Sequence, residues 1–592
     1  MNDPHVEYHR RLGVWDADIA RLGRLHALIS NLRLLAASLV ALMLWFAFAR
    51  AVVSPVWVLL PVAAFGGLVV AHARALNSLE RARRAYRLYE RGLARLGGGW
   101  AGMGADGSRF LDGHPFARDL DLFGRGSLFE LINTARTEAG EATLAEWFNA
   151  GADPDEVRAR QAAVRELRPM LDFREALSVL AAEAYVGRTG LLIAWASSPG
   201  AGLGAWAAWL LAGCALVTIA LAGVAVSGRG AEPLLVWLVI EYGVAFATRS
   251  RVDRALAGLE EAERDIMLVG AVLARIEREP FTAPRLASLR AALQSDGIAP
   301  SDRVASLRRL ISILDATRNQ MFAPIAYPLL VRCQVAVAID RWRRRYGPAV
   351  RRWLEVIGEV EALSAFAAYA FEHPADPFPS VVDRGPLFDA VALGHPLIAD
   401  GLSVPNDVQL GGDAPHVIVL SGSNMSGKST LLRSVGVNVV LALSGAPVRA
   451  SRVSLSRLAI GATLRIDDSL QEGHSRFYTE ILRIRGIVDT ARGQIPLLFL
   501  LDEILHGTNS YDRRIGAEGV VRALVGLGAI GLVTTHDLAL TALPASLGPT
   551  AANRHFEDRF EDGKLVFDYR MRPGVVDHSN ALALMRAIGL DV

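Results

Sequence analysis

The sequence predicts an α/β domain of the P-loop type, a mostly parallel sheet flanked by helices, joined to an all-α region with about four transmembrane helices. Two observations predict the α/β domain. An apolar run at 416–420 leads into SGSNMSGKST at 421–430, and IPLLFLLDE at 495–503 is an apolar strand that ends in two acids. Long uncharged stretches, set among Ala- and Arg-rich helical sequence, predict the all-α region.

The loop at 421–430 stands between an apolar strand and an apolar-periodic helix, which is the setting of a phosphate-binding loop. Gly422, Gly427, Lys428 and Ser429 fit the pattern G-x-x-x-x-G-K-[ST]. The glycines let backbone N–H groups surround phosphate oxygens, and the helix N-terminus adds partial positive charge. We therefore predict a site for ATP and Mg²⁺ in which Lys428 reaches the outer phosphates and Ser429 ligates the metal.

Composition limits the classes of protein that fit. A chain of 592 residues is too long for one core, so several domains are expected. A net charge of +2, from 63 basic and 61 acidic residues, gives no global signal for binding a polyanion. The two cysteines exclude a disulfide framework and a cysteine zinc site. A mean hydropathy of +0.28 is high for a soluble nucleotide-binding protein and indicates membrane spans.

The first hundred residues predict a membrane hairpin. Residues 1–30 read as a short amphipathic helix with Arg10, Arg11, Arg21 and Arg24 among spaced apolar residues. Two apolar stretches follow at 34–49 and 52–70, each close to the length of a span. A buried helical hairpin of a soluble protein is the alternative.

A second apolar hairpin is predicted at 202–226 and 234–247, joined by the short turn SGRGAEP. Its second member is brief and contains Glu241, which we expect to lie at the interface or to pair with a neighbour rather than to line an ion pathway. Arginines flank the spans on one side, so the positive-inside rule places both termini and the large segments in the cytoplasm. The sequence thus predicts a multi-pass protein of the inner (cell) membrane with its nucleotide site in the cytoplasm.

The remaining boundaries follow from helical periodicity and from a Pro-rich linker at 373–386. The predicted segments are 1–100 with the first hairpin, 101–195 as a helical segment, 196–248 with the second hairpin, 249–386 with long helices and the linker, and 387–592 as the nucleotide-binding domain.

One helical stretch, DRWRRRYGPAVRRW at 340–353, is strongly basic and contains Trp342, Tyr346 and Trp353. Such a cluster can contact a nucleic acid backbone. The favoured interpretation is a solvated helix face near the anionic inner leaflet.

Two further strands carry chemistry at their carboxyl ends. Asp502 and Glu503 end the strand at 495–503; we expect Asp502 to hold Mg²⁺ and Glu503 to polarise the attacking water. The apolar run at 529–533 leads to His536, an imidazole that can sense the γ-phosphate. Ser475 precedes an apolar-periodic helix, so it can cap a helix N-terminus that points at an anion.

These motifs together resemble a known family. SGSNMSGKST, GHSRFYTEI, LLFLLDEILHGTNSYD and TTHD, in this order, are similar to the ATPase domain of the MutS family of DNA mismatch repair proteins, within the ABC-type ATPase superfamily. The segments HPLIADGLSVPNDVQL at 395–410 and 127–164 resemble the entry to that domain and the start of the MutS core. The resemblance covers about 110–190 and 250–592, so it implies an ABC-type ATPase domain and a core or lever made of helices.

The resemblance also implies roles. It implies that phosphate and Mg²⁺ are bound by the loop residues Gly422, Ser423, Asn424, Met425, Ser426, Gly427, Lys428, Ser429 and Thr430. Asp502 and Glu503 become the Walker B pair and His536 the switch histidine. Ser475 would act in trans on ATP bound by a partner subunit, with the loop at 506–509 crossing the same interface. Val404 and Tyr569 fall where the family packs the adenine.

The family further implies a homodimer through the ATPase domains and mismatched or branched DNA as a partner. Three departures define a membrane-anchored branch without the mismatch-recognition domain. The first hundred residues are membrane-associated, Phe173–Glu175 lies in a helical stretch where packing is expected rather than a Phe-x-Glu wedge, and no helix-turn-helix follows the ATPase domain before Val592.

Two alternatives stay open. The first is an ABC-type membrane transport or remodelling ATPase that does not act on DNA; four short spans are few for a translocation path, and GHSRF stands where transporters carry an LSGGQ-like run. The second is a scaffold that binds nucleotide without catalysis, which the intact Lys428, Asp502, Glu503 and His536 oppose.

Overall fold

The computed structural model describes residues 3–182, 189–294, 297, 299–320, 322–399, 401–465, 476–505, 508–536, 540–561 and 564–576. Two compact units divide the chain. The first contains Met1–Met103 and Asp172–Ala182, and the second contains Gly104–Leu171 and Glu183–Val592.

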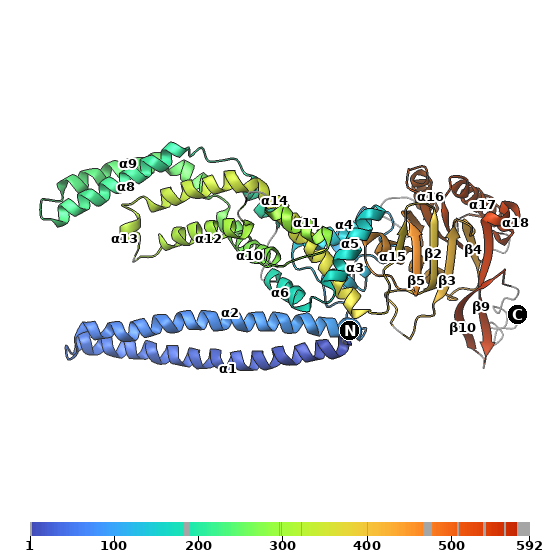
Figure 1. Ribbon diagram of the computed structural model, residues 1–592, viewed down its shortest axis with the longest axis horizontal. Coiled ribbons are helices and arrows are strands. Elements are labelled where there is room, and N and C mark those ends of the chain that lie inside the picture. The colour runs from blue at the N-terminus through green and yellow to red at the C-terminus, as the bar shows by residue number, and fades with distance from the viewer. Residues whose placement is uncertain are drawn as a thin grey trace. The chain divides into compact units, whose positions relative to one another are not determined.

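The first unit is a long helical hairpin with one added helix (Figure 1). Its members are α1 (Pro4–Leu44), the π-helical turn Trp45–Ala49, the 3₁₀ turn Pro55–Val58, α2 (Leu59–Leu96) and α6 (Leu171–Ala181). The Asp3 side chain accepts a hydrogen bond from the backbone N–H of His5, and Pro4 occupies the first turn, so both residues favour a helix start here.

The expected separate amphipathic helix at 1–30 is wrong, because α1 runs without a break into the predicted span at 34–49. Gly13 and Gly23 lie inside α1, and each weakens a helix by only about 1 kcal/mol. Packing of α1 along α2 offsets that cost. A Cβ at Gly92 would lie 2.6 Å from the Tyr8 ring, so glycine is what lets the two helices approach there.

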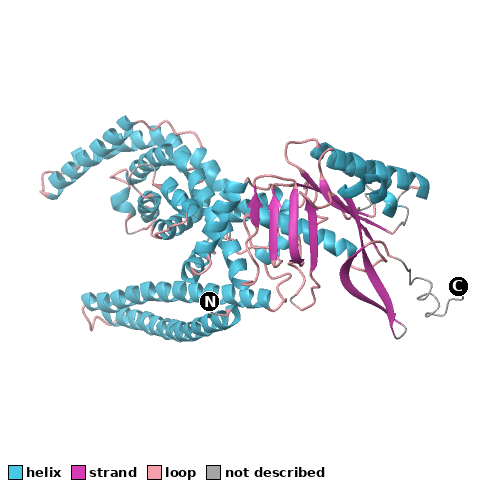
Figure 2. Cartoon of the chain, turned by 45° about the vertical axis from the view of Figure 1, so that its right-hand side comes forward, coloured by secondary structure: helices cyan, strands magenta, loops and turns pink. Residues whose placement is uncertain are grey.

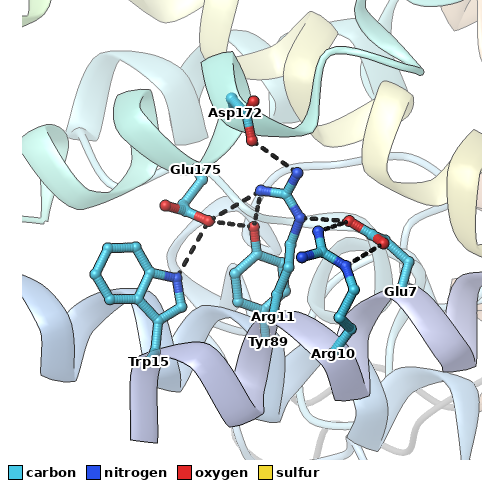
Figure 3. A network of polar contacts seen from close by, with 7 residues as sticks. All are labelled: Glu7, Arg10, Arg11, Trp15, Tyr89, Asp172 and Glu175. Carbon is cyan, nitrogen blue, oxygen red and sulfur yellow. Dashed lines mark hydrogen bonds and ion pairs between the residues drawn. The ribbon is translucent and has the colours of Figure 1, made fainter. Parts of the chain in front are cut away.

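Charged side chains close the open end of this hairpin (Figure 3). The Arg11 guanidinium contacts Glu7 at 2.7 Å, Asp172 at 2.7 Å, the Tyr89 hydroxyl at 3.1 Å and Glu175 at 3.2 Å. Hydrogen bonds from Arg10 and Arg11 lower the pKa of Glu7 to about 2, and burial raises the pKa of Tyr89. Arg11 thereby joins α1, α2 and α6.

The helical part of the second unit is built around α14 (Val331–Glu372), against which α4, α5, α7, α8, α9, α11 and α12 pack. The helices are α3 (Leu128–Ile132), α4 (Glu138–Asn149), α5 (Pro154–Leu167), α7 (Thr189–Ser197), α8 (Ala205–Val226), α9 (Glu232–Leu256), α10 (Leu259–Glu277), α11 (Pro284–Leu293), α12 (Pro300–Ala316) and α13 (Ala323–Ala326). The buried Glu361 of α14 accepts hydrogen bonds from the backbone N–H groups of Arg136 at 3.0 Å and Thr137 at 3.3 Å, which ties α14 to the start of α4.

Among the described residues, three helices are long and apolar enough to cross a membrane: Pro4–Ala49, Pro55–Leu96 and Trp206–Val226. Of the most apolar window of each helix, 6%, 11% and 22% respectively is buried. The fourth predicted span, 234–247, lies in α9 and is not among the three. Glu241 is buried there and accepts a hydrogen bond from the Thr218 hydroxyl at 2.5 Å, so the prediction that it pairs with a neighbour is confirmed.

Two sheets form the C-terminal part (Figure 2). The larger has the order β10-β9-β4-β8-β7-β6, in which every pair is parallel except β10 with β9. Its strands are β4 (Val417–Ser421), β6 (Ala459–Thr463), β7 (Leu497–Asp502), β8 (Ile530–Thr535), β9 (Ala551–Glu561) and β10 (Lys564–Pro573). The mostly parallel sheet predicted from three apolar runs is thus present.

A second sheet, with the order β1-β5-β2-β3, was not predicted. It contains β1 (Ser380–Val382), β2 (Leu387–Leu393), β3 (Asn406–Gly411) and β5 (Arg452–Ser456), so part of the predicted linker at 373–386 is a strand. The helices of this part are α15 (Lys428–Ser444), α16 (Arg476–Ala491), α17 (Ser510–Gly526) and α18 (Leu543–Leu547).

Candidate nucleotide-binding site

Strand order brings the predicted site residues together. β4 and β7 flank β8 and run parallel to it, with Ser421 opposite Thr535 and Asp502 opposite Thr534. The carboxyl ends of the three strands therefore meet at one edge, and ligands of parallel sheets bind at that edge. The loop at 421–427, the acids after β7 and the histidine after β8 all lie there.

The phosphate loop has the backbone that its glycines allow. Gly422 has φ +145° and Gly427 has φ +104°, and a Cβ at Gly422 would lie 2.9 Å from the carbonyl oxygen of Phe556. The loop ends at the N-terminus of α15, so the first-turn N–H groups and the helix dipole face the loop. Among the described residues, the Ser423 and Ser426 hydroxyl oxygens are buried without a hydrogen-bond partner. Such donors fit the oxygens of a phosphate.

Lys428 and Glu503 lie close together. The Lys428 ammonium is buried, donates to the carbonyl oxygens of Gly422 at 2.8 Å and Ser423 at 2.7 Å, and lies 3.9 Å from a Glu503 carboxylate oxygen. Burial lowers the pKa of Lys428. His536 Nδ1 lies 3.4 Å from the same Glu503 oxygen, so this oxygen has both an ammonium group and an imidazole as neighbours.

Thr534 positions the two acids. Its hydroxyl accepts a hydrogen bond from the backbone N–H of Glu503 at 3.0 Å and donates one to the Asp502 carboxylate. Glu503 has φ +48°, which turns its side chain away from the regular course of β7. The motif TTHD contains Thr534, but only the strand register shows that this residue faces the acids.

A cavity of about 500 Å³ adjoins the loop. Its lining includes Asn424, Met425, Gly427, Lys428, Ser429, Thr430 and Glu503 from the phosphate side, and Val404 and Tyr569 from the side where the adenine is expected. The structure therefore brings Val404 and Tyr569 to the cavity that the phosphate loop lines. The volume suits a nucleotide-sized ligand.

Sequence reasoning missed other residues of this cavity, among them Asn406. Its side-chain N–H₂ donates to the carbonyl oxygen of Tyr569 at 3.0 Å, and its side-chain oxygen accepts from the N–H of Met571 at 2.7 Å. Asn406 thus holds β10 against the start of β3. The buried His395 also lines the cavity, and burial lowers its pKa to about 4, so its imidazole is neutral at physiological pH.

Ser429 and Asp502 are the expected Mg²⁺ ligands. Among the described residues, no group of three or more His, Cys, Asp or Glu side chains is placed to hold a metal ion. One hydroxyl and one carboxylate nevertheless fit Mg²⁺, which keeps several waters and takes its other ligands from a nucleotide.

Ser475, together with His506 and Gly507 of the loop at 506–509, lies outside the described residues. Asn509 is described and caps α17, accepting the N–H of Asp512 at 2.9 Å. The buried Glu480 of α16 accepts the backbone N–H of Leu505, so the helix that follows Ser475 is attached to the segment after Glu503.

A chain of polar contacts connects α14 with α15. The Tyr369 hydroxyl of α14 donates to Asp376 at 3.1 Å, and Asp376 pairs with Arg449 at 2.9 Å. The backbone N–H of Arg449 donates to the side chain of Asn438 at 2.7 Å, and Asn438 lies in the middle of α15. Movement of α15 can therefore reach α14 through residues in contact.

The basic stretch at 340–353 departs from the nucleic-acid interpretation. Trp342 and Trp353 are buried in the helical core, and Arg343 is buried against Asp340 at 3.0 Å. These rings cannot stack on bases, because other side chains cover them. Arg341, Arg344 and Arg345 remain exposed.

Comparison with known proteins identifies relatives of this chain. Residues 418–591 match the family described as MutS domain V. A DNA mismatch repair protein MutS of Brevibacillus brevis is 32% identical over 254 residues, which cover 42% of this chain and 29% of that protein. A DNA mismatch repair protein MutS 2 of Halobacterium salinarum is 33% identical over 279 residues, covering 46% of this chain and 30% of that protein.

The chain thus spans less than a third of the length of these relatives. The resemblance read from the motifs is supported at the level of a MutS-related family with a domain V type of α/β fold. Neither comparison addresses the apolar helices.

Proposed function

We propose that this MutS-related chain is a membrane-anchored ATPase that binds and hydrolyses ATP where the ATPase domains of two copies meet. One observation carries the proposal: Lys428 and His536, from two separate segments, each lie within 4 Å of the same carboxylate oxygen of Glu503, and Lys428 and Glu503 line the 500 Å³ cavity. A scaffold that only binds nucleotide has no need of a carboxylate and an imidazole at that position.

ATP binding would use the groups already aimed at the cavity. The adenine lies between Val404 and Tyr569, and the phosphates lie on the loop N–H groups and the N-terminus of α15. Lys428 exchanges its two carbonyl acceptors for phosphate oxygens, which releases Glu503 from its cation. Mg²⁺, held by Ser429 and Asp502, supplies charge neutralisation for the phosphates.

Hydrolysis needs a base that orients water. Glu503, freed from Lys428, accepts a proton of the attacking water, and His536 positions the Glu503 carboxylate. Ser475 of a second copy completes the site at the γ-phosphate, so turnover requires a dimer.

The apolar helices suggest where this chemistry takes place. The candidate spans carry their apolar side chains exposed, which suits lipid as their solvent in the inner membrane, with the ATPase domain in the cytoplasm. Contacts from α15 through Arg449 to α14 give ATP binding a physical route to the helical part.

Mismatched DNA is the partner that the related proteins' names suggest, and branched DNA is a second candidate substrate. The exposed arginines of α14 are the local positive charge for such a contact. A transport or remodelling ATPase that ignores DNA is the second candidate, favoured by the same apolar helices.

The test is ATP turnover of the full chain in lipid nanodiscs, with and without homoduplex, mismatched and branched DNA. We expect Glu503→Gln to bind ATP and to lose turnover at least a hundredfold. Glu518→Gln, an exposed residue of α17 paired with Arg522, is the matched control and should turn over normally. Full turnover by Glu503→Gln would refute the catalytic assignment, and a rate indifferent to every DNA would favour the transport or remodelling candidate.

A further inference from the structure

We infer that residues 322–330, the connection that contains α13 between α12 and α14, form a membrane-interface element that inserts its exposed apolar side chains among lipids beside α8. We call these residues the α13 tip. The inference rests on the proposed insertion of α8 in a membrane, and it adds a lipid-binding segment that is too short and too interrupted to register as a span.

The composition of the α13 tip is unusual for a surface connection. Its sequence, FAPIAYPLL, has no charged residue and only one polar group, the Tyr327 hydroxyl. Ile325 is 56% exposed and Tyr327 is 69% exposed, whereas Leu330 is buried. Connections in water are normally polar. An exposed, uncharged connection therefore needs an apolar environment.

Packing places the α13 tip beside the predicted span. Leu330 and Cys333, where α14 begins, belong to one buried cluster with Ala207, Leu211 and Cys214 of α8. All three α8 residues lie inside the candidate span Trp206–Val226. The tip is therefore level with the middle of α8, near Leu211 and Cys214, and meets a bilayer whose surface lies at that level.

A hydrogen bond at the other end of the contact between α8 and α14 shows how the two helices run along each other. Arg344 donates to the carbonyl oxygen of Leu203 at 2.8 Å, just before α8 begins. Leu330 lies 14 residues earlier in α14, which corresponds to about 21 Å along the helix. Between the level of Leu203 and its own N-terminus, α14 therefore runs beside about the first three or four turns of α8. The tip lies at that far end, and the exposed side chains of α8 just beyond it, among them Leu216 and Ile219, are those expected to face lipid.

The charged side chains next to the α13 tip are of the kind found at a membrane interface. Arg332 and Arg249 both pair with Asp253, at 3.0 and 3.7 Å, and remain largely exposed next to the cluster. Arginine with a long apolar stem and tyrosine with a polar tip are typical of the boundary between hydrocarbon and headgroups. Tyr327 can then keep its hydroxyl at the headgroup level while Ile325 enters the acyl region.

Lipid fits the α13 tip better than other occupants. The absence of charge excludes a contact with nucleic acid phosphates, which requires Lys or Arg. A stable contact with a second copy buries about 800 Å² on each partner. Two large exposed side chains on a nine-residue connection supply far less, whereas a bilayer accepts an isolated apolar tip.

The experiment compares single added cysteines, labelled with the fluorophore NBD, in nanodiscs of phosphatidylcholine and phosphatidylglycerol. Ile325→Cys reports on the α13 tip, Leu216→Cys on the exposed face of α8, and Ser288→Cys on the exposed surface of α11. The native Cys214 and Cys333 are buried, and unsubstituted protein measures their background labelling. Lipids with a nitroxide spin label quench a probe in the membrane, and iodide quenches a probe in water.

We expect the Ile325→Cys probe to emit at shorter wavelength than the Ser288→Cys probe and to be quenched by spin-labelled lipid rather than by iodide. If the Leu216→Cys probe is quenched by lipid while the Ile325→Cys probe behaves like Ser288→Cys, the inference fails and the membrane anchor stands. If both are quenched by iodide, the proposed anchor of α8 fails as well. A probe at 325 that neither agent quenches would show a second copy over the tip, which also overturns the inference.

Discussion

Replacing Thr534 with valine tests how Glu503, the proposed catalytic carboxylate, is held. The Thr534 side chain is buried between β7 and β8, where its hydroxyl accepts the Glu503 N–H at 3.0 Å and donates to the Asp502 carboxylate. Valine keeps the shape and removes the hydroxyl. A buried N–H and a carboxylate oxygen then lose their partner.

The magnitude follows from those two bonds. A neutral hydrogen bond contributes about 1 kcal/mol and one to a charged group about 2 kcal/mol, so roughly 3 kcal/mol of local stabilisation is lost. Glu503, at φ +48°, holds a backbone conformation that costs about 1–3 kcal/mol and depends on such support. If half of the loss raises the barrier to hydrolysis, kcat falls about tenfold.

The assay is single-turnover ATP hydrolysis together with ATP affinity, which should stay within about twofold because only kcat carries the loss. Thr463→Val is the matched control. Thr463 is equally buried on β6, which pairs with β7 on the side away from β8, and its hydroxyl has no hydrogen-bond partner among the described residues. Wild-type kcat in Thr534→Val, or an equal loss in Thr463→Val, would refute the reasoning.

Three further outcomes are expected. Asn406→Ala loses two hydrogen bonds that hold β10 at the cavity, so the Kd for ATP should rise about tenfold with kcat unchanged, and Gln409→Ala on the exposed side of β3 should leave both alone. Burial holds the pKa of His395 at about 4, below its value in the unfolded chain, so its contribution to stability is present above pH 6.5 and is lost as pH falls toward 4. Thermal unfolding should therefore show that the free energy of unfolding falls by roughly 2 kcal/mol between pH 7 and pH 5. In His395→Gln this pH-dependent loss should be absent. Glu175→Gln weakens the hydrogen-bond acceptor shared by Arg11, Trp15 and Tyr89, so limited proteolysis near α6 should accelerate severalfold. Arg21→Gln removes an exposed ion pair with Asp18 on α1 and should leave the rate of proteolysis unchanged.

The phosphate loop and its strands could be predicted because local sequence determines them. Fully buried parallel strands read as continuous apolar runs, and the glycines at 422 and 427 stand where the backbone requires positive φ. The acids and His536 follow those strands directly, so topology alone places them together.

The smaller sheet, the supporting residues of the site and the buried face of α14 depend on contacts between residues distant in sequence. β1, β2, β3 and β5 alternate buried and exposed residues over a few positions, a pattern too short to separate from a loop. Asn406 and Thr534 are ordinary polar residues until the fold brings Asn406 to the backbone of Tyr569 and the strand register sets Thr534 opposite Asp502. The aromatic residues at 340–353 looked available for stacking, but the face of a helix that is buried depends on its neighbours, and here α7 and α12 cover Trp342.

The central claim, ATP hydrolysis completed by a second copy, is tested most directly by mixing two inactive variants. Lys428→Ala cannot hold ATP but keeps Ser475, and Ser475→Ala keeps the ATP site but cannot complete its partner's. Alone, each should be inactive. When the two are mixed in equal amounts and reconstituted in nanodiscs, half the dimers are mixed and each has one complete site, so we predict recovery of about a quarter of wild-type turnover. No recovery, or full turnover by Ser475→Ala alone, would contradict hydrolysis at a dimer interface.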